Sequence, residues 1–336
     1  MGATITAIAS YFPEKILSNA VLASQFVGWT AEKIESKTGI ANRHVVGSNE
    51  FASDLAVKAV ERLFEISAID RLSVDAIFYC TQSPDYILPT TACLLQNRLG
   101  LKQSVAALDF NLGCSGFVYG LGLVHGFIAG GQAQRVLLIT SDTYSRYLHP
   151  GDRGVRTLFG DAAAAVLIDQ VEGVGGLSGP FIYGTDGMGG ENLMLPAGGL
   201  RCAVSVDAKV TTDVSGNQRT VNHLFMNGPE IFNFTLRVVP ATVTELLERA
   251  ELILDQIDLF VFHQANGYML EHLRKGLMIP REKFVVSMQD TGNTVSSTIP
   301  IALEKCIASG QLKRGMRVML LGFGVGYSWA GTILEW

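Results

Sequence analysis

The chain has 336 residues, of which 48% are hydrophobic and 17% are charged, and its formal net charge is −5. This composition is typical of a large, well-packed globular protein and excludes a disordered one. The mild negative charge, without a run of Lys and Arg, argues against a nucleic-acid-binding protein. At this length we expect two core-bearing units, or two halves of one domain.

The first residues, MGATITAIASYFPEK, lack the charged and apolar segments of a secretory signal, and no apolar stretch is long enough to span a membrane. The five cysteines are odd in number, widely spaced and without a CxxC pair. They are Cys80, Cys93, Cys114, Cys202 and Cys306. This pattern predicts neither a disulfide framework nor a zinc site. We therefore expect a cytosolic protein that holds no metal and does not enter a membrane.

The predicted elements of the first half alternate between strands and helices. In chain order they are a first strand (4–10), a buried strand (75–83), a helix (91–99), a second buried strand (106–111), a tight turn (113–116), a long helix, and a strand within 128–139. Nearly continuous apolar strands between helices indicate parallel βαβ units with both faces covered. The sequence therefore predicts an α/β fold.

The second half repeats this order. Its predicted elements are a buried strand (258–266), a helix from Met269, a strand (284–288), a tight turn (292–295), and a helix that leads to a strand within 307–321. The register repeats as well, because Gln311 follows Asn293 at the spacing at which Gln132 follows Cys114. We therefore expect two similar halves, residues 1–175 and 176–336, packed around a pseudo-twofold axis.

The repeat places three reactive residue types at corresponding points. Cys114 and Asn293 both follow a strand and precede a helix, and His263 ends the strand that corresponds to the one ending near Thr81. Ligands in such sheets bind beyond the carboxyl ends of the strands. We therefore expect Cys114, His263 and Asn293 to converge on one site.

Each of the three residues also has an ordinary structural interpretation. A cysteine is usually a small core residue, a lone histidine at a strand end is usually a satisfied core group, and Gly-Asn-Thr suits a turn or a helix N-cap. Cys114 differs because glycines flank it at a helix start, where free N–H groups and the helix dipole favour a thiolate. The three residues together are far more specific than any one of them.

Seven motifs carry a resemblance that covers essentially the whole chain. They are KTGIANRH from Lys37, GCSGF from Gly113, DRG from Asp152, FGDAAAAVL from Phe159, HQAN from His263, GNT from Gly292 and GFGVG from Gly322. With these motifs the chain resembles the β-ketoacyl-acyl carrier protein synthase III enzymes of the thiolase superfamily. The resemblance implies a thiolase-like fold layered α-β-α-β-α, and a Cys-His-Asn triad at Cys114, His263 and Asn293.

The reaction implied by the resemblance is a decarboxylating Claisen condensation. Cys114 would take an acyl group from a thioester, usually acyl-CoA. A malonyl thioester, usually on acyl carrier protein, would then lose carbon dioxide, and its carbanion would attack the acyl group to give a β-ketoacyl thioester. His263 and Asn293 would stabilise the enolate by hydrogen bonding. Thioesters are the substrates, and no metal or redox cofactor is implied.

The resemblance implies further site residues and a homodimer. The oxyanion hole of the acyl step would come from the backbone N–H groups of Cys114 and Val325. The acyl pocket would include Phe323 and Leu88, which would reach into the pocket of the partner subunit. The expected contacts to CoA or the carrier protein are Lys37, Arg153, Asn266, Arg274 and Lys275.

The chain also departs from the family pattern. Lys33 stands where the family usually has a Trp that stacks on adenine, with Trp29 one turn earlier. Other usual residues are replaced as follows: an Arg by Tyr268, a Lys by Asn233, a Gly by Val325 and an aromatic gate by Leu88. The smaller gate predicts acceptance of acyl groups longer or bulkier than acetyl. The acyl donor, the carrier and the pathway stay open, between fatty-acid initiation and a polyketide, quinolone or acyl-glycan pathway.

Two other functions are compatible with this fold. The first is an acyltransferase that moves the acyl group from Cys114 to a hydroxyl or an amine without decarboxylation. The second is an inactive homologue that serves as a partner subunit, against which the intact triad speaks.

Overall fold

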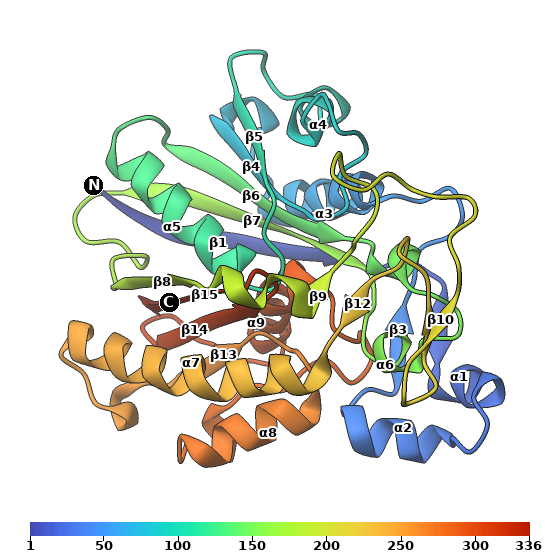
Figure 1. Cartoon of the computed structure of the whole chain (residues 1–336). Helices are drawn as coiled ribbons and strands as arrows, with labels where there is room; N and C mark the ends of the chain where they lie inside the picture. The colour runs from blue at the N-terminus through green and yellow to red at the C-terminus, as the bar shows by residue number, and fades with distance from the viewer.

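The computed structural model describes residues 1–336, which form two β-sheets with helices between and around them (Figure 1). The first sheet has the order β1-β7-β6-β4-β5 and the second has the order β13-β14-β15-β8. The strands of the first sheet are β1 (Gly2–Tyr11), β4 (Ala76–Cys80), β5 (Ala106–Phe110), β6 (Arg135–Asp142) and β7 (Ala162–Val171). Those of the second sheet are β8 (Phe181–Thr185), β13 (Leu259–Phe262), β14 (Arg317–Gly324) and β15 (Ser328–Glu335).

The two sheets repeat one arrangement of strands. In the first, β4 and β6 are parallel, and β7 and then β1 follow in antiparallel pairing. In the second, β13 and β14 are parallel, and β15 and then β8 follow in antiparallel pairing. The duplication expected from the sequence is therefore visible in the sheet order. We propose to divide the chain near residue 175, between β7 and β8.

The prediction of a strand at residues 284–288 was wrong, because this segment forms only a parallel β-bridge between Phe284 and Phe260. The reason is the side chain of Gln264, which donates to Val285 O at 3.3 Å and accepts from Ser287 N at 2.8 Å. These backbone groups are thus already bonded and do not extend a ladder. The segment still occupies the position that β5 has in the first sheet.

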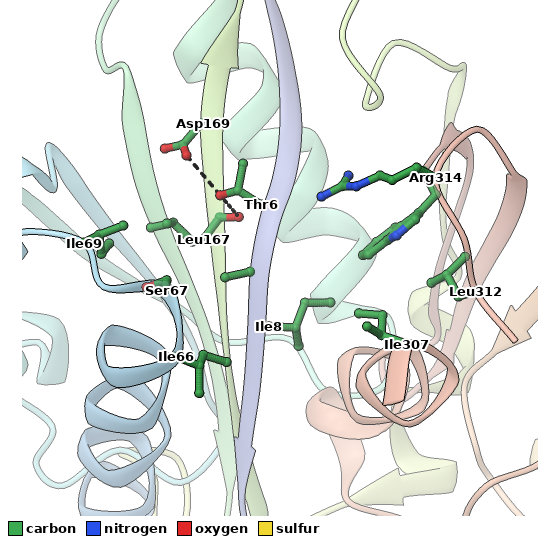
Figure 2. A pocket seen from close by; sticks show the side chains of 12 residues that line it. Thr6, Ile8, Ile66, Ser67, Ile69, Leu167, Asp169, Ile307, Leu312 and Arg314 are labelled. Carbon is green, nitrogen blue, oxygen red and sulfur yellow. Dashed lines mark hydrogen bonds between the residues drawn. The ribbon is translucent and has the colours of Figure 1, made fainter. Parts of the chain in front are cut away.

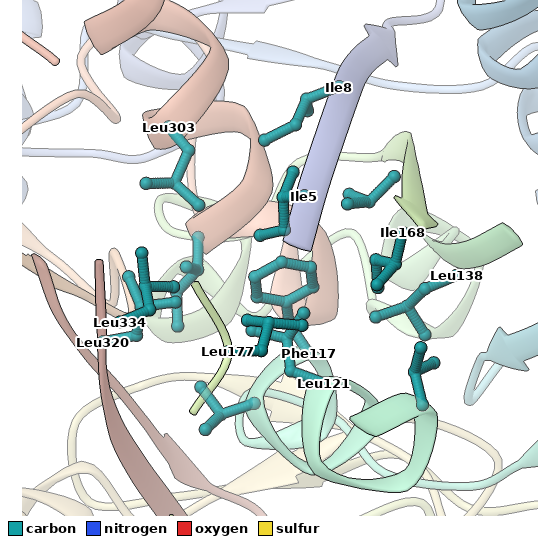
Figure 3. Close-up of a cluster of buried hydrophobic side chains, with 14 of the residues drawn as sticks. Ile5, Ile8, Phe117, Leu121, Leu138, Ile168, Leu177, Leu303, Leu320 and Leu334 are labelled. Carbon is teal, nitrogen blue, oxygen red and sulfur yellow. The ribbon is translucent and has the colours of Figure 1, made fainter. Parts of the chain in front are cut away.

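Three helical layers alternate with the two sheets. The outer face of the first sheet is covered by α3 (Ala52–Ser67) and α4 (Thr91–Arg98), and that of the second by α7 (Gly228–Ala250) and α8 (Gly267–Gly276). Between the sheets lie α5 (Gly116–Ala129) and α9 (Thr298–Ala308). Figure 3 shows this central core, where Phe117 of α5 and Leu303 of α9 meet Ile5 and Leu320 from the two sheets. The predicted α-β-α-β-α layering is confirmed.

The smaller elements lie mostly around one end of the molecule. The helices are α1 (Asn19–Gln25), α2 (Ala31–Thr38) and α6 (Arg153–Arg156), and the short strands are β2 (Ile16–Ser18), β3 (Asn42–His44), β9 (Leu193–Met194), β10 (Thr211–Thr212), β11 (Gln218–Arg219) and β12 (Phe225–Met226). The 3-10 turns are η1 (Arg71–Ser73), η2 (Tyr144–Tyr147), η3 (Gly187–Asn192), η4 (Leu254–Gln256), η5 (Arg281–Lys283) and η6 (Val295–Ser297). None of the helices combines the length and the apolar character needed to cross a membrane.

Two details of the predicted element ends differ from the structure. Helix α8 begins before Met269, because the side chain of Asn266 caps it by accepting from Met269 N at 2.8 Å. Asn293 does not directly precede an α-helix, since η6 lies between it and α9. Cys114 does lie at a helix start, immediately before Ser115, the N-cap of α5.

Candidate active site

The structure brings Cys114, His263 and Asn293 together at one narrow cavity of about 70 Å³. Cys114 comes from the turn before α5, His263 follows β13, and Asn293 lies in the turn before η6. All three side chains are buried, with 6%, 2% and 5% of their surface exposed. The convergence expected from the repeat is thus observed, and both halves of the chain contribute to the cavity.

Backbone bonds from the first half hold Asn293 in place. Its N–H donates to Leu158 O at 2.9 Å, and its carbonyl accepts from Gly160 N at 3.0 Å. Its side-chain Oδ1 accepts from Val295 N at 2.9 Å, which leaves the amide Nδ2 to face His263. Val295 has φ of +56°, an unfavourable conformation for a β-branched residue, so the fold holds strained backbone next to the site.

The imidazole of His263 is fixed between two polar groups. Its Nδ1 lies 2.7 Å from Thr298 Oγ1, and its Nε2 lies 3.5 Å from Asn293 Nδ2. The ring also packs edge-on against Phe323, with 5.6 Å between the ring centroids. Two nitrogens, from His263 and Asn293, therefore lie side by side at the cavity and can converge on a single oxygen atom of a ligand.

Burial sets the resting protonation of the triad. It lowers the pKa of His263 to about 3, so the imidazole is neutral. Burial also raises the pKa of Cys114 to about 12, and the negative charge of Asp142 adds to the increase. The expectation of a thiolate in the resting site was therefore wrong, because the desolvation of Cys114 outweighs the nearby N–H groups. The resting pair is a neutral thiol beside a neutral imidazole.

The backbone N–H groups of Cys114 and Val325 lower the pKa of the Cys114 thiol and partly offset this increase. The turn that carries Val325 is braced, since Ser328 Oγ donates to Val325 O at 2.9 Å and lies 2.6 Å from Ser115 Oγ. Gly324 is required here, because a Cβ at this position would lie 2.8 Å from Cys114 Sγ. Gly324 thus allows the turn that carries Val325 to lie close to the sulfur, and the role of the Cys114 and Val325 N–H groups as an oxyanion hole stays a prediction.

A second, larger cavity of about 610 Å³ is lined in part by Val325, and it shares Leu193 with the narrow cavity. Its walls combine the apolar side chains of Leu193, Leu195 and Leu224 with polar ones. The polar wall consists of Gln82, Asp85, Asn111, Tyr144 and Tyr147.

Val325 is one of the residues that line the larger cavity. Its side chain packs so closely on Gly113 that a Cβ there would lie 2.7 Å from Val325 Cγ1. The valine that replaces the usual glycine of the family is thus accommodated by the glycine before Cys114.

The two predicted acyl-pocket residues have different surroundings. Phe323 lines the narrow cavity with the triad rather than the larger one. Leu88 lines neither cavity in its own chain and is 79% exposed, whereas its neighbours Tyr86 and Ile87 do line the larger cavity. Leu88 is therefore available to contact a second chain.

The residues expected to bind CoA lie partly around Trp29. Its ring is contacted from one side by Lys33, 4.9 Å from the ring centroid, and also by Arg153 at 5.2 Å. Arg153 additionally donates to Ser215 O. Lys33 occupies the position where the family usually has its tryptophan. Trp29, one turn earlier, nevertheless lies close enough to contact Arg153.

The remaining predicted binding residues lie on α2 and α8. Lys37 is exposed in the last turn of α2, which packs against α8, and Asn266 lines the narrow cavity. Arg274 makes a bidentate pair with Glu271 at 2.7 and 2.9 Å, and donates to Ile279 O at 2.8 Å. The guanidinium of Arg274 is therefore engaged within the helix end, and its predicted contact to CoA or the carrier protein stays a prediction. Lys275 is 70% exposed and only 3.5 Å from Glu271.

Asn233 and Tyr268, two residues that differ from the family pattern, lie on the facing helices α7 and α8. Asn233 donates to Glu230 at 3.5 Å, and Tyr268 is 64% exposed with its ring 5.8 Å from that of Phe232. Neither side chain lines the two cavities. Both therefore alter the outer surface rather than the reactive centre.

Several residues of the narrow cavity were not predicted. They are Leu158, Phe159, Leu193, Met226, Gly228, Ile231, Ala265, Met269 and Gly324. Most are apolar, and they come from separate elements, among them β9, β12, α7, α8 and β14, so no local pattern in the sequence links them to one site. Phe159 could have been found, because it opens one of the seven motifs.

Another hollow, of about 510 Å³, is lined by none of the triad residues. Figure 2 shows Ile66 at the end of α3 and Ile307 at the end of α9 on either side of Ile8, with Arg314 nearby. Arg314 lies over the ring of Trp336 and donates to Ile5 O at 3.3 Å. These bonds occupy the only cation of the hollow, and no reactive group lies in it.

The chain is similar to known synthases over its full length. The family model 3-Oxoacyl-(acyl-carrier-protein (ACP)) synthase III matches residues 108–187, and the model of its C terminal matches residues 247–336. Beta-ketoacyl-(acyl-carrier-protein) synthase III of Caldanaerobacter subterraneus subsp. tengcongensis is 35% identical, covering 100% of this chain and 98% of the relative.

Solved structures agree with this relationship. A 3-oxoacyl-(acyl-carrier-protein) synthase III at 2.1 Å is 51% identical with a TM-score of 0.98, covering 100% of both chains. The 3-oxoacyl-(acyl-carrier protein) synthase from Burkholderia xenovorans LB400 is 36% identical with a TM-score of 0.91, covering 100% of this chain and 94% of that one. By full-length identity, fold and matched family models, this chain belongs to the 3-oxoacyl-(acyl-carrier-protein) synthase III family of the thiolase superfamily.

Proposed function

We propose that this enzyme joins an acyl group from acyl-CoA to a malonyl thioester by decarboxylating Claisen condensation. The observation that carries the proposal is the convergence of Cys114, His263 and Asn293 on one buried cavity. In this proposal Cys114 is the nucleophile, and the enzyme is an acyltransferase that holds its substrate covalently between two steps.

In the first step, Cys114 Sγ attacks the thioester carbonyl of acyl-CoA. The N–H groups of Cys114 and Val325 receive the oxyanion of the tetrahedral intermediate. The bond between the acyl carbon and the CoA sulfur then breaks, and the proton lost by Cys114 ends on the CoA thiol. Because the resting thiol is neutral, proton loss has to accompany the attack.

In the second step, a malonyl thioester enters the same cavity. Its carboxylate leaves as carbon dioxide, and the electron pair delocalises onto the thioester oxygen. We place that oxygen between His263 Nε2 and Asn293 Nδ2. This requires the tautomer with the ring proton on Nε2, and the hydroxyl proton of Thr298 turned from Val295 O toward Nδ1. The carbanion attacks the acyl carbon and the bond to Sγ breaks. The departing Cys114 thiolate then takes up a proton from solvent, which restores the neutral thiol.

A direct assay distinguishes condensation from simple acyl transfer. The enzyme is first acylated with acyl-CoA and then given malonyl thioester labelled in its free carboxyl group. We expect labelled carbon dioxide and β-ketoacyl product in equal amounts. Acyl transfer to a hydroxyl or amine without carbon dioxide release would instead support the alternative acyltransferase function.

The outer residues indicate how the thioesters would bind. We propose that adenine of CoA stacks at Arg153 and Trp29, and that Lys37 and Lys275 attract the phosphates of CoA or of a carrier protein. Asn266 would contact the pantetheine arm, because it lines the narrow cavity. Acyl carrier protein is the expected malonyl carrier, and a cytosolic location fits five cysteines that are all free.

A homodimer is the expected assembly. Strand β5 is an edge of the first sheet, paired only with β4, and Leu108 on it and Leu123 on α5 are exposed by 37% and 47%. Together with Leu88 they give an apolar surface that a second copy would cover. Light scattering at assay concentration should give the mass of two chains. A fully active monomer would contradict this assembly.

Replacing Leu88 should change acyl selectivity. We propose that Leu88 of one subunit closes the larger cavity of the other, so that a residue smaller than Phe leaves room beyond acetyl. In competition between acetyl-CoA and octanoyl-CoA for Cys114, the wild type should take octanoyl readily, and Leu88→Phe should shift the preference toward acetyl. A pocket can discriminate by about 1–3 kcal/mol per methylene, so one residue is enough.

The matched control is Ile66→Phe, which enlarges another exposed aliphatic residue, 59% exposed, that lines neither the triad cavity nor the larger one. Its acyl preference should equal that of the wild type. A wild type limited to acetyl, or equal preferences in wild type and Leu88→Phe, would show that Leu88 is not the gate.

A further inference from the structure

Four polar residues on one side of the larger cavity are linked by hydrogen bonds. Tyr144 OH donates to Gln82 Oε1 at 2.5 Å, and Gln82 Nε2 donates to Asn111 Oδ1 at 2.8 Å. Tyr147 OH donates to the backbone carbonyl of Gln82 at 3.2 Å. All four residues line the cavity. Because Gln82 takes part in every one of these bonds, we call the four residues the Gln82 network.

The Gln82 network lies at the reactive end of the cavity. The side chain of Gln82 packs on the residue before the nucleophile, since a Cβ on Gly113 would come within 2.5 Å of Gln82 Oε1. Tyr144 is buried and belongs to the same cluster of side chains as Cys114. Its ring centroid lies 5.1 Å from that of Phe159, which lines the triad cavity. An acyl group that extends from Cys114 into the larger cavity would therefore meet the network close to its thioester end.

The network is held rigidly. Gln82 N donates to Asp142 Oδ1 at 2.8 Å, which fixes the backbone of Gln82 at the end of β6. Both ends of its side-chain amide are also bonded, to Tyr144 and to Asn111. Polar groups that are already fixed in place lose little conformational freedom when a ligand binds, so they can discriminate between ligands.

The bonds within the network leave part of its hydrogen-bonding capacity unused. A phenol that donates its proton can still accept, and a primary amide has two N–H donors. Tyr144 and Tyr147 both use their proton, and neither oxygen accepts a bond. Gln82 Nε2 makes one bond and Asn111 Nδ2 makes none. The network therefore offers both acceptors and donors to a ligand.

A plain alkyl chain does not match this side of the cavity. It would remove the phenol oxygens and amide N–H groups from water without replacing those hydrogen bonds, which costs free energy. A hydroxyl group both donates and accepts, so one hydroxyl can satisfy a phenol oxygen and an amide N–H together. The apolar side chains of Leu193, Leu195 and Leu224 suit the rest of a carbon chain. The cavity thus matches an aliphatic acyl group with a hydroxyl near its thioester.

The charge of the cavity argues against an acidic acyl group. Its lining includes Asp85, whose Oδ1 is buried without a hydrogen-bond partner, and it includes no Lys, Arg or His. A carboxylate on the acyl chain would meet a like charge and no cation, in a place with little access to water. A neutral hydroxyl meets no such penalty.

We propose that the acyl donor of this enzyme is a hydroxyacyl thioester, and that the Gln82 network recognises its hydroxyl. This inference rests on the proposed function, because it concerns the acyl group that Cys114 takes up. The gate proposed at Leu88 limits the length of the acyl chain, and the network determines its polarity. The hydroxyl makes hydrogen bonds only, so it remains on the β-ketoacyl product and the two chemical steps are unchanged.

The test is competition between 3-hydroxyoctanoyl-CoA and octanoyl-CoA for Cys114, measured by intact mass spectrometry. The two acyl groups have the same chain length and differ by one oxygen atom, so their acyl-enzymes are resolved by mass. The faster enantiomer of the hydroxyacyl donor should be taken up about tenfold faster than octanoyl, because it replaces a hydrogen bond that octanoyl cannot make. Equal uptake, or a preference for octanoyl, would overturn the inference.

Two variants test whether the network causes this preference. Tyr144→Phe removes one hydroxyl, and Gln82→Leu removes the amide at similar size, so each should bring the preference close to unity. Either variant serves if the other fails to fold. The matched control is Tyr119→Phe, which removes a phenol that donates to Gly184 O at 3.4 Å and lines neither cavity. It should keep the wild-type preference. A preference that persists in both network variants, or that is lost equally in Tyr119→Phe, would contradict recognition by the network.

Uptake is measured before malonyl thioester is added, so this inference and the proposed function can fail separately. Acylation of Cys114 without discrimination would overturn the hydroxyacyl inference and leave the proposed function intact. Selective acylation without release of carbon dioxide on addition of malonyl thioester would refute condensation and support the inference. Absence of acylation by both thioesters would refute the two together.

Discussion

Replacing Cys114 with Ala should abolish formation of the acyl-enzyme. Intact mass spectrometry after incubation with a panel of acyl-CoAs should show one added acyl group on the wild type and none on the variant. Cys114 is the only cysteine at the narrow cavity, and the backbone N–H groups of Cys114 and Val325 lower the pKa of its thiol. Among the buried thiols, Cys80 donates to Leu112 O and Cys306 packs in the central core, so neither can reach a thioester.

Cys93→Ala is the matched control for this prediction. Cys93 is exposed on α4 and lines neither cavity, so it is the thiol most available to adventitious acylation. The Cys93→Ala variant should still gain one acyl group. A Cys114→Ala protein that is folded and gains one acyl mass at another cysteine would refute the assignment of the nucleophile.

The pH dependence of acylation should reflect the neutral resting thiol. Because burial raises the pKa of Cys114 to about 12, the reaction with iodoacetamide should still increase with pH above 9 in the free enzyme. A resting thiolate would instead give a rate that is constant over that range. Acyl-CoA should react faster than this profile implies, because the oxyanion donors act only on a bound carbonyl.

The sequence predicted which three residues meet at the site because the two halves of the chain repeat the same order of strands and helices. Apolar strands and their spacing placed Cys114, His263 and Asn293 at equivalent strand ends, and the sheet order then brings them together. The pattern failed at residues 284–288, where a long-range side-chain contact from Gln264 replaces backbone pairing. Local propensity contains no information about such a contact.

The pKa of the thiol and the shape of the larger cavity depend on residues that are distant in the sequence, so the repeated pattern could not predict them. The thiol pKa is governed by burial, which the fold as a whole creates, whereas the helix-start motif alone suggested a thiolate. The larger cavity is built from Gln82, Tyr144 and Leu224, which are far apart in the sequence and lie in loops. The ion pair between Arg274 and Glu271 could have been predicted from the sequence, because the two residues are three positions apart on one helix face.

Removing either donor of the second oxyanion site should separate the two steps of the reaction. In His263→Ala and in Asn293→Ala, we expect acylation of Cys114 to continue, since the donors that we propose for that step are the N–H groups of Cys114 and Val325. Malonyl decarboxylation should fall by about 10²–10³-fold, because the enolate oxygen loses one of its two side-chain donors. The measurements are intact mass for acylation and release of labelled carbon dioxide for decarboxylation.

Two further variants show whether the lost group acts as a donor or only fills space. Asn293→Asp has almost the same shape, but it places carboxylate oxygen where Nδ2 faces His263, so it should decarboxylate no faster than Asn293→Ala. His272→Ala removes an exposed imidazole of α8 outside the cavity and should leave both steps unchanged. Since Asn293 Oδ1 is already bonded to Val295 N, the substituted side chain keeps its orientation, and only the charge and the missing hydrogens change. Normal decarboxylation in both alanine variants would mean that the malonyl thioester oxygen binds elsewhere. Equal loss of acylation and decarboxylation would mean that His263 and Asn293 only maintain the shape of the cavity and do not stabilise the enolate.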